Sequence, residues 1–157
     1  MSEIEPLDLR LDRFVDRLPV KMENNQRMVR CLLRKKWLVL QPEEFVRQLL
    51  LHFFIEDMHY NRNRITVERG LRVDSQDKRT DILVFDKRMR PWLLVECKAP
   101  KRPLSNQTFQ QASTYNNPLQ APFMMVSNGR QSFVCEIDYE QGSYTFLIAP
   151  PEYSDLS

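Results

Sequence analysis

The chain of 157 residues is long enough for one domain with a sizeable buried core, and its 42% hydrophobic and 28% charged residues are typical of a globular protein in water. No apolar run approaches the ~20 residues of a membrane span and the N-terminus has no signal-peptide pattern, which argues against a membrane partner and favours the cytoplasm. The net charge of +2 conceals an excess of 12 basic over 6 acidic residues between positions 61 and 102, which favours nucleic acid as a partner but also fits a solvated basic face.

Residues 1–40 are predicted to be an N-terminal extension with short strands. Leucines at positions 7, 9 and 11 alternate with polar residues, which indicates a half-exposed strand. The basic triplet Arg34-Lys35-Lys36 would suit contact with phosphates, although a run of three basic residues is more often simply solvated.

The clearest helix is predicted to begin at Gln41-Pro42, where a proline and two acids suit the free N–H groups of a helix start. Apolar residues then recur at intervals of three and four and form one buried stripe, which comprises Val46, Leu49, Leu50, Phe53 and Phe54. Helical phase places Glu43 on this stripe and turns Glu44 about 100° away from it. Glu44 remains the alternative because helix starts are easily misphased.

A hairpin is predicted further along the chain. Strands are expected at residues 65–73, 82–85 and 92–95, and the last two are joined by a turn at 87–90. With this turn, Asp81 lies opposite Glu96. Side chains alternate along a strand, so Lys98 shares the face of Glu96, and all three groups meet at the open end of the hairpin.

Two carboxylates beside apolar neighbours repel each other and lose hydration unless a cation neutralises them. Mg2+, or Mn2+ in its place, suits such a pair, because Mg2+ keeps several waters when only one or two carboxylates hold it. Lys98 is placed to orient or deprotonate one of these waters. The alternative is a structural salt bridge of Asp81, Glu96 and Lys98 on a solvated face.

Asp81 followed by Glu96-Cys97-Lys98 resembles the D…(D/E)-x-K signature of the PD-(D/E)XK nuclease superfamily. The string Leu-Val-Glu-Cys-Lys-Ala-Pro at positions 94–100 resembles more narrowly the N-terminal nuclease domain of type I restriction enzyme R subunits. The resemblance implies that Asp81 and Glu96 hold the metal and that Lys98 is catalytic. It also implies a glutamate on the first helix that completes the metal site, assigned to Glu43 in the string Pro42-Glu43-Glu44-Phe45-Val46-Arg47-Gln48.

A second helix is predicted from the N-cap Ser105 to about Asn117. Gln111 and Tyr115 are four residues apart on one face of it, and they match the Q-x-x-x-Y element that follows the nuclease motif in R subunits. Nucleic-acid contact or support of the site is therefore expected from four residues, namely Gln111, Tyr115, Lys101 and Arg102.

The last strands are predicted at residues 123–126, 131–137 and 143–148, before a loose tail at 150–157. The order of elements indicates an α/β fold in which residues 41–149 form the core, and the resemblance makes this core restriction-endonuclease-like, with a central mixed β-sheet flanked by α-helices. Three widely spaced cysteines, Cys31, Cys97 and Cys135, are expected to be buried free thiols.

The predicted function is a Mg2+-dependent nuclease that hydrolyses phosphodiester bonds in nucleic acid, with DNA as the expected substrate. The 157 residues contain no G-x-x-x-x-G-K-[ST] phosphate loop, so a motor is excluded, and a nuclease that acts alone, as a homodimer or with separate partner subunits is expected. Two alternatives remain: a catalytically silent nuclease-fold module that binds nucleic acid or a protein partner, and an interaction domain whose charged cluster is structural.

Overall fold

A mixed β-sheet forms the centre of the protein in the computed structural model. The structure describes residues 4–73 and 76–153, and for 68–73 and 76–80 it describes the backbone only. The six strands of the sheet lie in the order of the chain, β4 (Ile65–Val73), β5 (Gln76–Phe85), β6 (Pro91–Cys97), β7 (Phe123–Ser127), β8 (Ser132–Asp138) and β9 (Ser143–Phe146). β6 and β7 are parallel and every other neighbouring pair is antiparallel.

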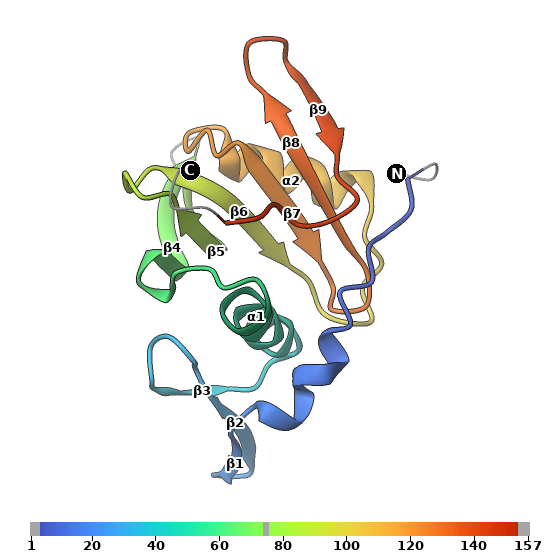
Figure 1. The fold of residues 1–157 in the computed structure, drawn as a ribbon. Coiled ribbons are helices and arrows are strands. Elements are labelled where there is room, and N and C mark those ends of the chain that lie inside the picture. Colours follow the sequence, from blue (N-terminus) through green and yellow to red (C-terminus); the bar gives the residue numbers. More distant parts are fainter. Residues whose placement is uncertain (1–3, 74–75, 154–157) are drawn as a thin grey trace.

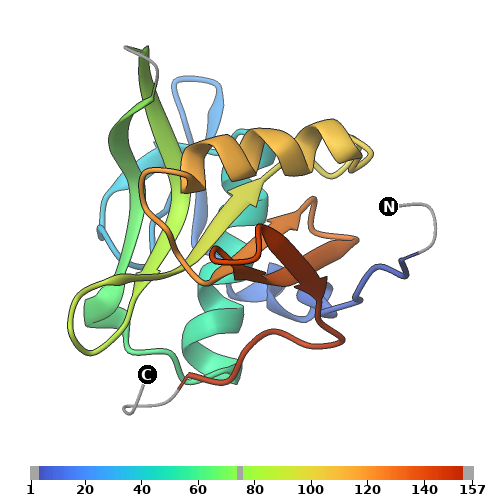
Figure 2. The same ribbon diagram turned by 90° about the horizontal axis from the view of Figure 1, so that it is seen from above.

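Helices α1 (Pro42–His52) and α2 (Asn106–Asn116) cover opposite faces of this sheet (Figures 1 and 2). α2 is the crossover that makes β6 and β7 parallel, as a connection between parallel strands requires. The predicted α/β fold with a central mixed sheet flanked by helices is therefore confirmed, and both helices begin where the sequence places them. No helix in the described part of the chain is long and apolar enough to cross a membrane.

The two faces of the sheet bury different apolar sets because side chains alternate along each strand. Ile82 and Val95 point toward α1 and pack with Leu50 in the main core. Leu83 and Leu94 belong to the opposite face, where Tyr115 of α2 packs against them. All three cysteines are buried and free, as predicted.

A second, smaller sheet lies on the far side of α1 from the main sheet (Figure 1). It is antiparallel and comprises β1 (Val20–Glu23), β2 (Gln26–Arg30) and β3 (Trp37–Val39). The strand expected over residues 7–11 is wrong. Leu7 forms only an isolated bridge with Ser132, and the left-handed backbone of Arg10, at φ 54°, ends the extended chain before the 3-10 helix η1 (Leu11–Arg17).

Short helical turns connect α1 to the main sheet. α1 continues into the π-helical turn η2 (Phe53–Asp57), and the 3-10 helix η3 (Arg62–Arg64) precedes β4.

The chain after β9 returns to the core, so the expected loose tail is wrong for residues 150–153. Tyr60 Oη donates to the Pro151 carbonyl at 2.6 Å, and Tyr153 Oη donates to the Phe85 carbonyl at 3.0 Å. The remainder of the predicted tail, 154–157, lies outside the described residues.

Candidate functional site

The open end of the β5–β6 hairpin has the register that the sequence predicts. Ile82 faces Val95, which is the pairing that places Asp81 beside Glu96. Just beyond this pair, Asp81 Oδ2 accepts a hydrogen bond of 2.7 Å from the Cys97 backbone N–H. This bond holds the Asp81 carboxylate against β6, where Glu96 precedes Cys97 and Lys98 follows it.

The turn end of the hairpin differs from the prediction by one residue. A bulge after Val84 makes Phe85, and not Asp86, the partner of Pro91. The Asp86 carboxylate instead accepts backbone N–H groups of Arg88 and Arg90 at 2.9 and 3.0 Å, so it closes the turn. The slip stays at the turn, and the pairing near Asp81 keeps the predicted register.

Glu96 and Lys98 form a buried ion pair at the end of β6. Their residues are 6% and 8% exposed, and Lys98 Nζ lies 3.0 Å from Glu96 Oε1. The Lys98 backbone N–H donates to the Ser127 carbonyl of β7 at 2.8 Å, which extends the parallel pairing and fixes the lysine beside the sheet. Burial raises the pKa of Glu96 to about 7, and the Asp81 carboxylate adds to the rise, while Lys98 opposes it. The two carboxylates therefore repel each other across the hairpin.

We expect this repulsion to make the metal-free protein less stable as pH rises. A carboxyl whose pKa is about 7 when folded and near 4.5 when unfolded binds more protons in the folded state, so its stabilising contribution is present below pH 4.5 and lost as pH rises to about 7. Glu96→Gln removes this titration. Its free energy of unfolding relative to wild type should rise by roughly 2–3 kcal/mol across that window in urea titrations with EDTA.

A matched control is available on β8, where Glu136 is exposed. Glu136→Gln should leave the pH dependence of unfolding unchanged. A constant difference between Glu96→Gln and wild type from pH 4.5 to 7 would show that Glu96 is not strained by its surroundings.

The acids at the start of α1 have the opposite phase to the one predicted. Glu44 is buried, at 6% exposure, and Glu43 is exposed. The reason is polar: Glu44 Oε1 lies 2.5 Å from Arg47 Nη1, and Glu44 Oε2 accepts from Gln48 Nε2 at 2.9 Å, so three polar side chains are buried together one turn apart. Glu43 still lies near the site, because its charge contributes to the raised pKa of Glu96.

Arg47 is a central residue of the site that the sequence reasoning missed. Its guanidinium bridges the acids of two elements, with Nη1 on Glu44 and Nη2 2.9 Å from Asp81 Oδ1. Burial opposes its charge, but the carboxylates of Glu44 and Asp81 outweigh burial and raise the pKa of Arg47 further. One signal was available, because an arginine next to a buried apolar stripe needs a carboxylate partner.

α2 brings one of its two predicted residues near the acids. Ser105 caps the helix, as the sequence predicts, and it forms a capping box with Thr108. Tyr115 is half-buried, and burial raises the pKa of its hydroxyl. The negative charge of Glu96 adds to this rise, so Tyr115 is close enough to the acids to interact with them electrostatically. Gln111 is also half-buried, and among the described residues it forms no hydrogen bond with the acids.

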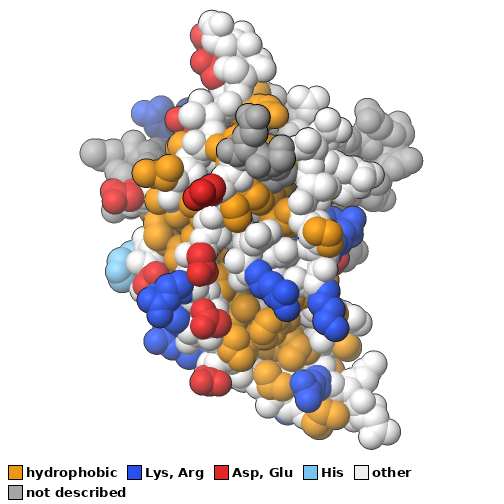
Figure 3. Space-filling model, turned by 90° about the vertical axis from the view of Figure 1, so that its right-hand side faces the viewer, with side chains coloured by type: hydrophobic (Ala, Val, Ile, Leu, Met, Phe, Trp, Pro, Cys, Tyr) orange, Lys and Arg blue, Asp and Glu red, His pale blue; other side chains and the backbone are white. Residues whose placement is uncertain are grey.

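Lys101 and Arg102 follow Lys98 closely and are exposed. Together with Arg130, from the turn between β7 and β8, they line a hollow of about 390 Å³. On the face shown in Figure 3, basic and acidic side chains are interspersed with exposed hydrophobic atoms. The hollow is thus a basic surface formed by residues that closely follow Lys98 in the chain and by the turn after β7.

The donor set suits a hard metal ion that keeps most of its waters. Among the residues that the structure describes, no three acidic, histidine or cysteine side chains form a ready-made metal cage. Asp81 and Glu96 supply two carboxylates on neighbouring strands. Arg47 binds one oxygen of Asp81, and Lys98 binds one oxygen of Glu96. Two carboxylates and several waters are a common way to hold Mg2+.

Comparison with known proteins gives one family and a similar solved structure. The family described as type I restriction enzyme R protein N terminus (HSDR_N) matches residues 42–151. A solved fragment assigned to an HsdR subunit of a type I restriction enzyme from Vibrio vulnificus YJ016 is 25% identical, with a TM-score of 0.51 over 71% of this chain and 24% of that chain. The protein thus corresponds to about a quarter of that fragment. No curated protein matches the chain.

Proposed function

The chain belongs to the family of type I restriction enzyme R protein N termini, and from this premise we propose that it is a Mg2+-dependent nuclease that hydrolyses phosphodiester bonds in DNA. One observation carries the proposal. The Asp81 carboxylate and the Glu96–Lys98 ion pair meet at the end of two paired strands, within a family whose full-length members are restriction enzyme subunits. The substrate and the metal are our inference from this chemistry.

Asp81 and Glu96 would hold the ion, and Glu43 would support it directly or through a water. Mn2+ is the alternative ion for the same oxygen donors. When bound, such an ion lowers the pKa of a coordinated water and clamps the scissile phosphate. Because the Asp81 and Glu96 carboxylates repel each other, a cation between them would also relieve the cost of their burial.

Lys98 would act on the reacting groups. Its ammonium is fixed beside Glu96 by an ion pair and by the backbone bond to Ser127, so its position needs no rearrangement during the reaction. It would position the attacking water and stabilise the negative charge that grows on the phosphate oxygens. The water oxygen bonds to phosphorus, the bond to the leaving oxygen breaks, and the water proton ends on that oxygen or in solvent.

Lys101 and Arg102 would bind the backbone of the substrate next to the cleavage point. Both are exposed, and they share a hollow with Arg130 that follows the catalytic strand directly. Phosphate neutralisation by such residues supplies affinity without sequence preference. Tyr115 and Gln111 would support the site from α2.

A catalytically silent module that binds nucleic acid is the second candidate. The retained acids argue against it, because two repelling carboxylates near phosphate weaken binding and a binder would gain affinity by losing them. We further propose that the protein works in the cytoplasm, which agrees with three buried free cysteines, and that it acts as a homodimer or with partner subunits.

We expect Mg2+ or Mn2+ to raise the melting temperature of the wild-type protein. At about 100 times the dissociation constant the gain is roughly 2.7 kcal/mol, which for a chain of this length corresponds to about 5–10 °C. Asp81→Asn keeps the shape of the side chain and should abolish most of this rise in differential scanning fluorimetry. Glu136→Gln, at an exposed acid, should respond as wild type does. A full metal response in Asp81→Asn would place the metal elsewhere.

The activity itself is tested with a panel of substrates. Supercoiled, linear and single-stranded DNA and RNA are each incubated with the protein in Mg2+, Mn2+ or EDTA. The proposal expects cleavage of DNA in the presence of metal and none in EDTA. Binding of DNA without cleavage under every metal condition would favour the silent module.

A further inference from the structure

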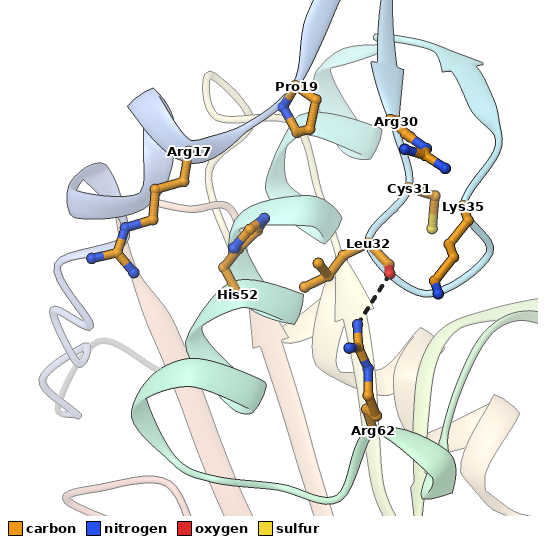
Figure 4. Close-up of a pocket in the computed structure, with 8 residues that line it drawn as sticks. All are labelled: Arg17, Pro19, Arg30, Cys31, Leu32, Lys35, His52 and Arg62. Atoms are coloured by element: carbon orange, nitrogen blue, oxygen red, sulfur yellow. Dashed lines mark hydrogen bonds between the residues drawn. The ribbon is translucent and has the colours of Figure 1, made fainter.

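A second basic region lies at the C-terminal end of α1, and none of Asp81, Glu96 and Lys98 lines it. Most of its residues precede position 42, where the family match begins. It is a hollow of about 370 Å³ between η1, the end of β2, the loop 31–36, the last residue of α1 and η3 (Figure 4). That volume is at the lower end of the range for small-molecule sites. These five elements therefore converge on one concave surface.

The charge of this hollow is one-sided. None of the described residues that line it is acidic, whereas Arg30, Lys35 and Arg62 are basic. In the described part of the chain none of these three cations forms an ion pair with a carboxylate, and Arg62 donates only to the Leu32 carbonyl, at 3.3 Å (Figure 4). Three positive charges thus surround the hollow without neutralisation.

A fourth cation, Arg17, behaves differently. It lies at the opposite end of the hollow, its guanidinium is directed away from the other lining residues (Figure 4), and it is paired with Glu56. His52 is buried in the wall, and its Nδ1 lies 3.0 Å from Oε1 of the same Glu56. The Glu56 carboxylate is therefore already engaged by Arg17 and His52.

The loop that carries Lys35 is held in one conformation. The Cys31 N–H donates to the Lys36 carbonyl and the Lys35 N–H donates to the Cys31 carbonyl, both at 2.9 Å. Lys35 itself takes the left-handed backbone, at φ 54°, which turns the loop back on itself. Of the two lysines in the basic triplet, Lys35 lines the hollow and Lys36 does not.

We propose that this hollow binds a phosphate group, either a phosphodiester of a nucleic-acid backbone or a free phosphate. Two guanidinium groups and an ammonium around a concave surface match the charge and the acceptor geometry of phosphate, because guanidinium binds it in a bidentate manner. Leu32, Cys31 and Pro19 give the hollow an apolar lining, and the three exposed cations stand around it. Phosphate binding here needs neither the metal nor the acids of the cleavage site, so this proposal can be tested independently of the nuclease proposal.

The test compares two neighbouring lysines, in EDTA throughout. Inorganic phosphate is titrated into the protein by calorimetry, and a labelled DNA duplex is titrated by fluorescence anisotropy. Lys35→Glu should weaken phosphate binding by at least roughly tenfold, whereas Lys36→Glu, at an exposed position outside the hollow, should stay within about twofold. Arg30→Glu is the second variant, because it alters the hollow from β2 if the loop variant fails to fold.

The two ligands distinguish the sources of phosphate. If phosphate displaces the duplex from wild type and Lys35→Glu weakens both, the hollow holds a nucleic-acid backbone. If phosphate binds but does not displace the duplex, the hollow holds a free phosphate. Equal losses in Lys35→Glu and Lys36→Glu, or no phosphate binding by wild type, would overturn the proposal. Asp81→Asn should bind phosphate as wild type does, whatever the fate of the nuclease proposal.

Discussion

Lys98→Ala is expected to reduce DNA cleavage by a factor of about 100 or more, the scale of losing one electrostatic catalytic group. The ammonium is fixed 3.0 Å from Glu96 in a buried position, so alanine removes a positive charge from the site itself. DNA affinity should fall little, because one phosphate contact among many supplies only a fraction of a salt-dependent affinity. Single-turnover cleavage and binding in EDTA measure the two quantities separately.

The matched variants are Lys101→Ala and Arg102→Ala, which remove exposed cations of the adjacent hollow. They should weaken DNA binding and flatten its salt dependence while cleavage at saturating DNA stays near normal. If Lys98→Ala instead loses binding and cleavage together, as these two do, Lys98 is one more phosphate contact and its catalytic role is wrong.

Arg47→Met is expected to lower the free energy of unfolding of the metal-free protein by about 3–5 kcal/mol, because it leaves the buried Glu44 and the half-buried Asp81 without their cation. Glu44 and Asp81 both depend on this guanidinium, at 2.5 and 2.9 Å. Urea unfolding in EDTA gives the loss. Adding Asp81→Asn to Arg47→Met should return part of the lost stability, since one of the unpaired charges is then removed.

Arg13→Met is the control for this result. Arg13 forms an ion pair of similar length, 3.1 Å, with Asp57, but both side chains are exposed to solvent. Surface pairs contribute about 0–1 kcal/mol, so this variant should unfold nearly as wild type does. A loss for Arg47→Met as small as that for Arg13→Met would contradict the role given to Arg47.

The hairpin register could be predicted from the sequence because it depends on local alternation. Two apolar runs with polar ends allow one pairing that buries both, and a shift of one residue would turn every side chain to the other face. The bulge after Val84 escaped prediction because it depends on how the Asp86 carboxylate closes the turn. The error was harmless to the site, since the pairing near Asp81 is set by the apolar residues.

The start of α1 could not be predicted in the same way. Its stripe was read from apolar residues alone, and that criterion ignores Glu44, Arg47 and Gln48, which are buried because they satisfy one another. The bridge from Arg47 to Asp81 joins residues 34 apart in sequence. Such a contact depends on the packing of α1 against the main sheet, so no local sequence pattern predicts which carboxylate Arg47 binds. The hollow around Lys35 likewise depends on the meeting of distant segments.

The most direct test of the central claim compares wild type with Asp81→Asn on plasmid DNA at saturating protein, in Mg2+ and in EDTA. The account predicts that wild type cuts in Mg2+ alone, and that Asp81→Asn still binds the plasmid but cuts it at least about 100-fold more slowly. Cutting that continues in EDTA, or that proceeds at the wild-type rate in Asp81→Asn, would contradict a metal-dependent site built on Asp81 and Glu96.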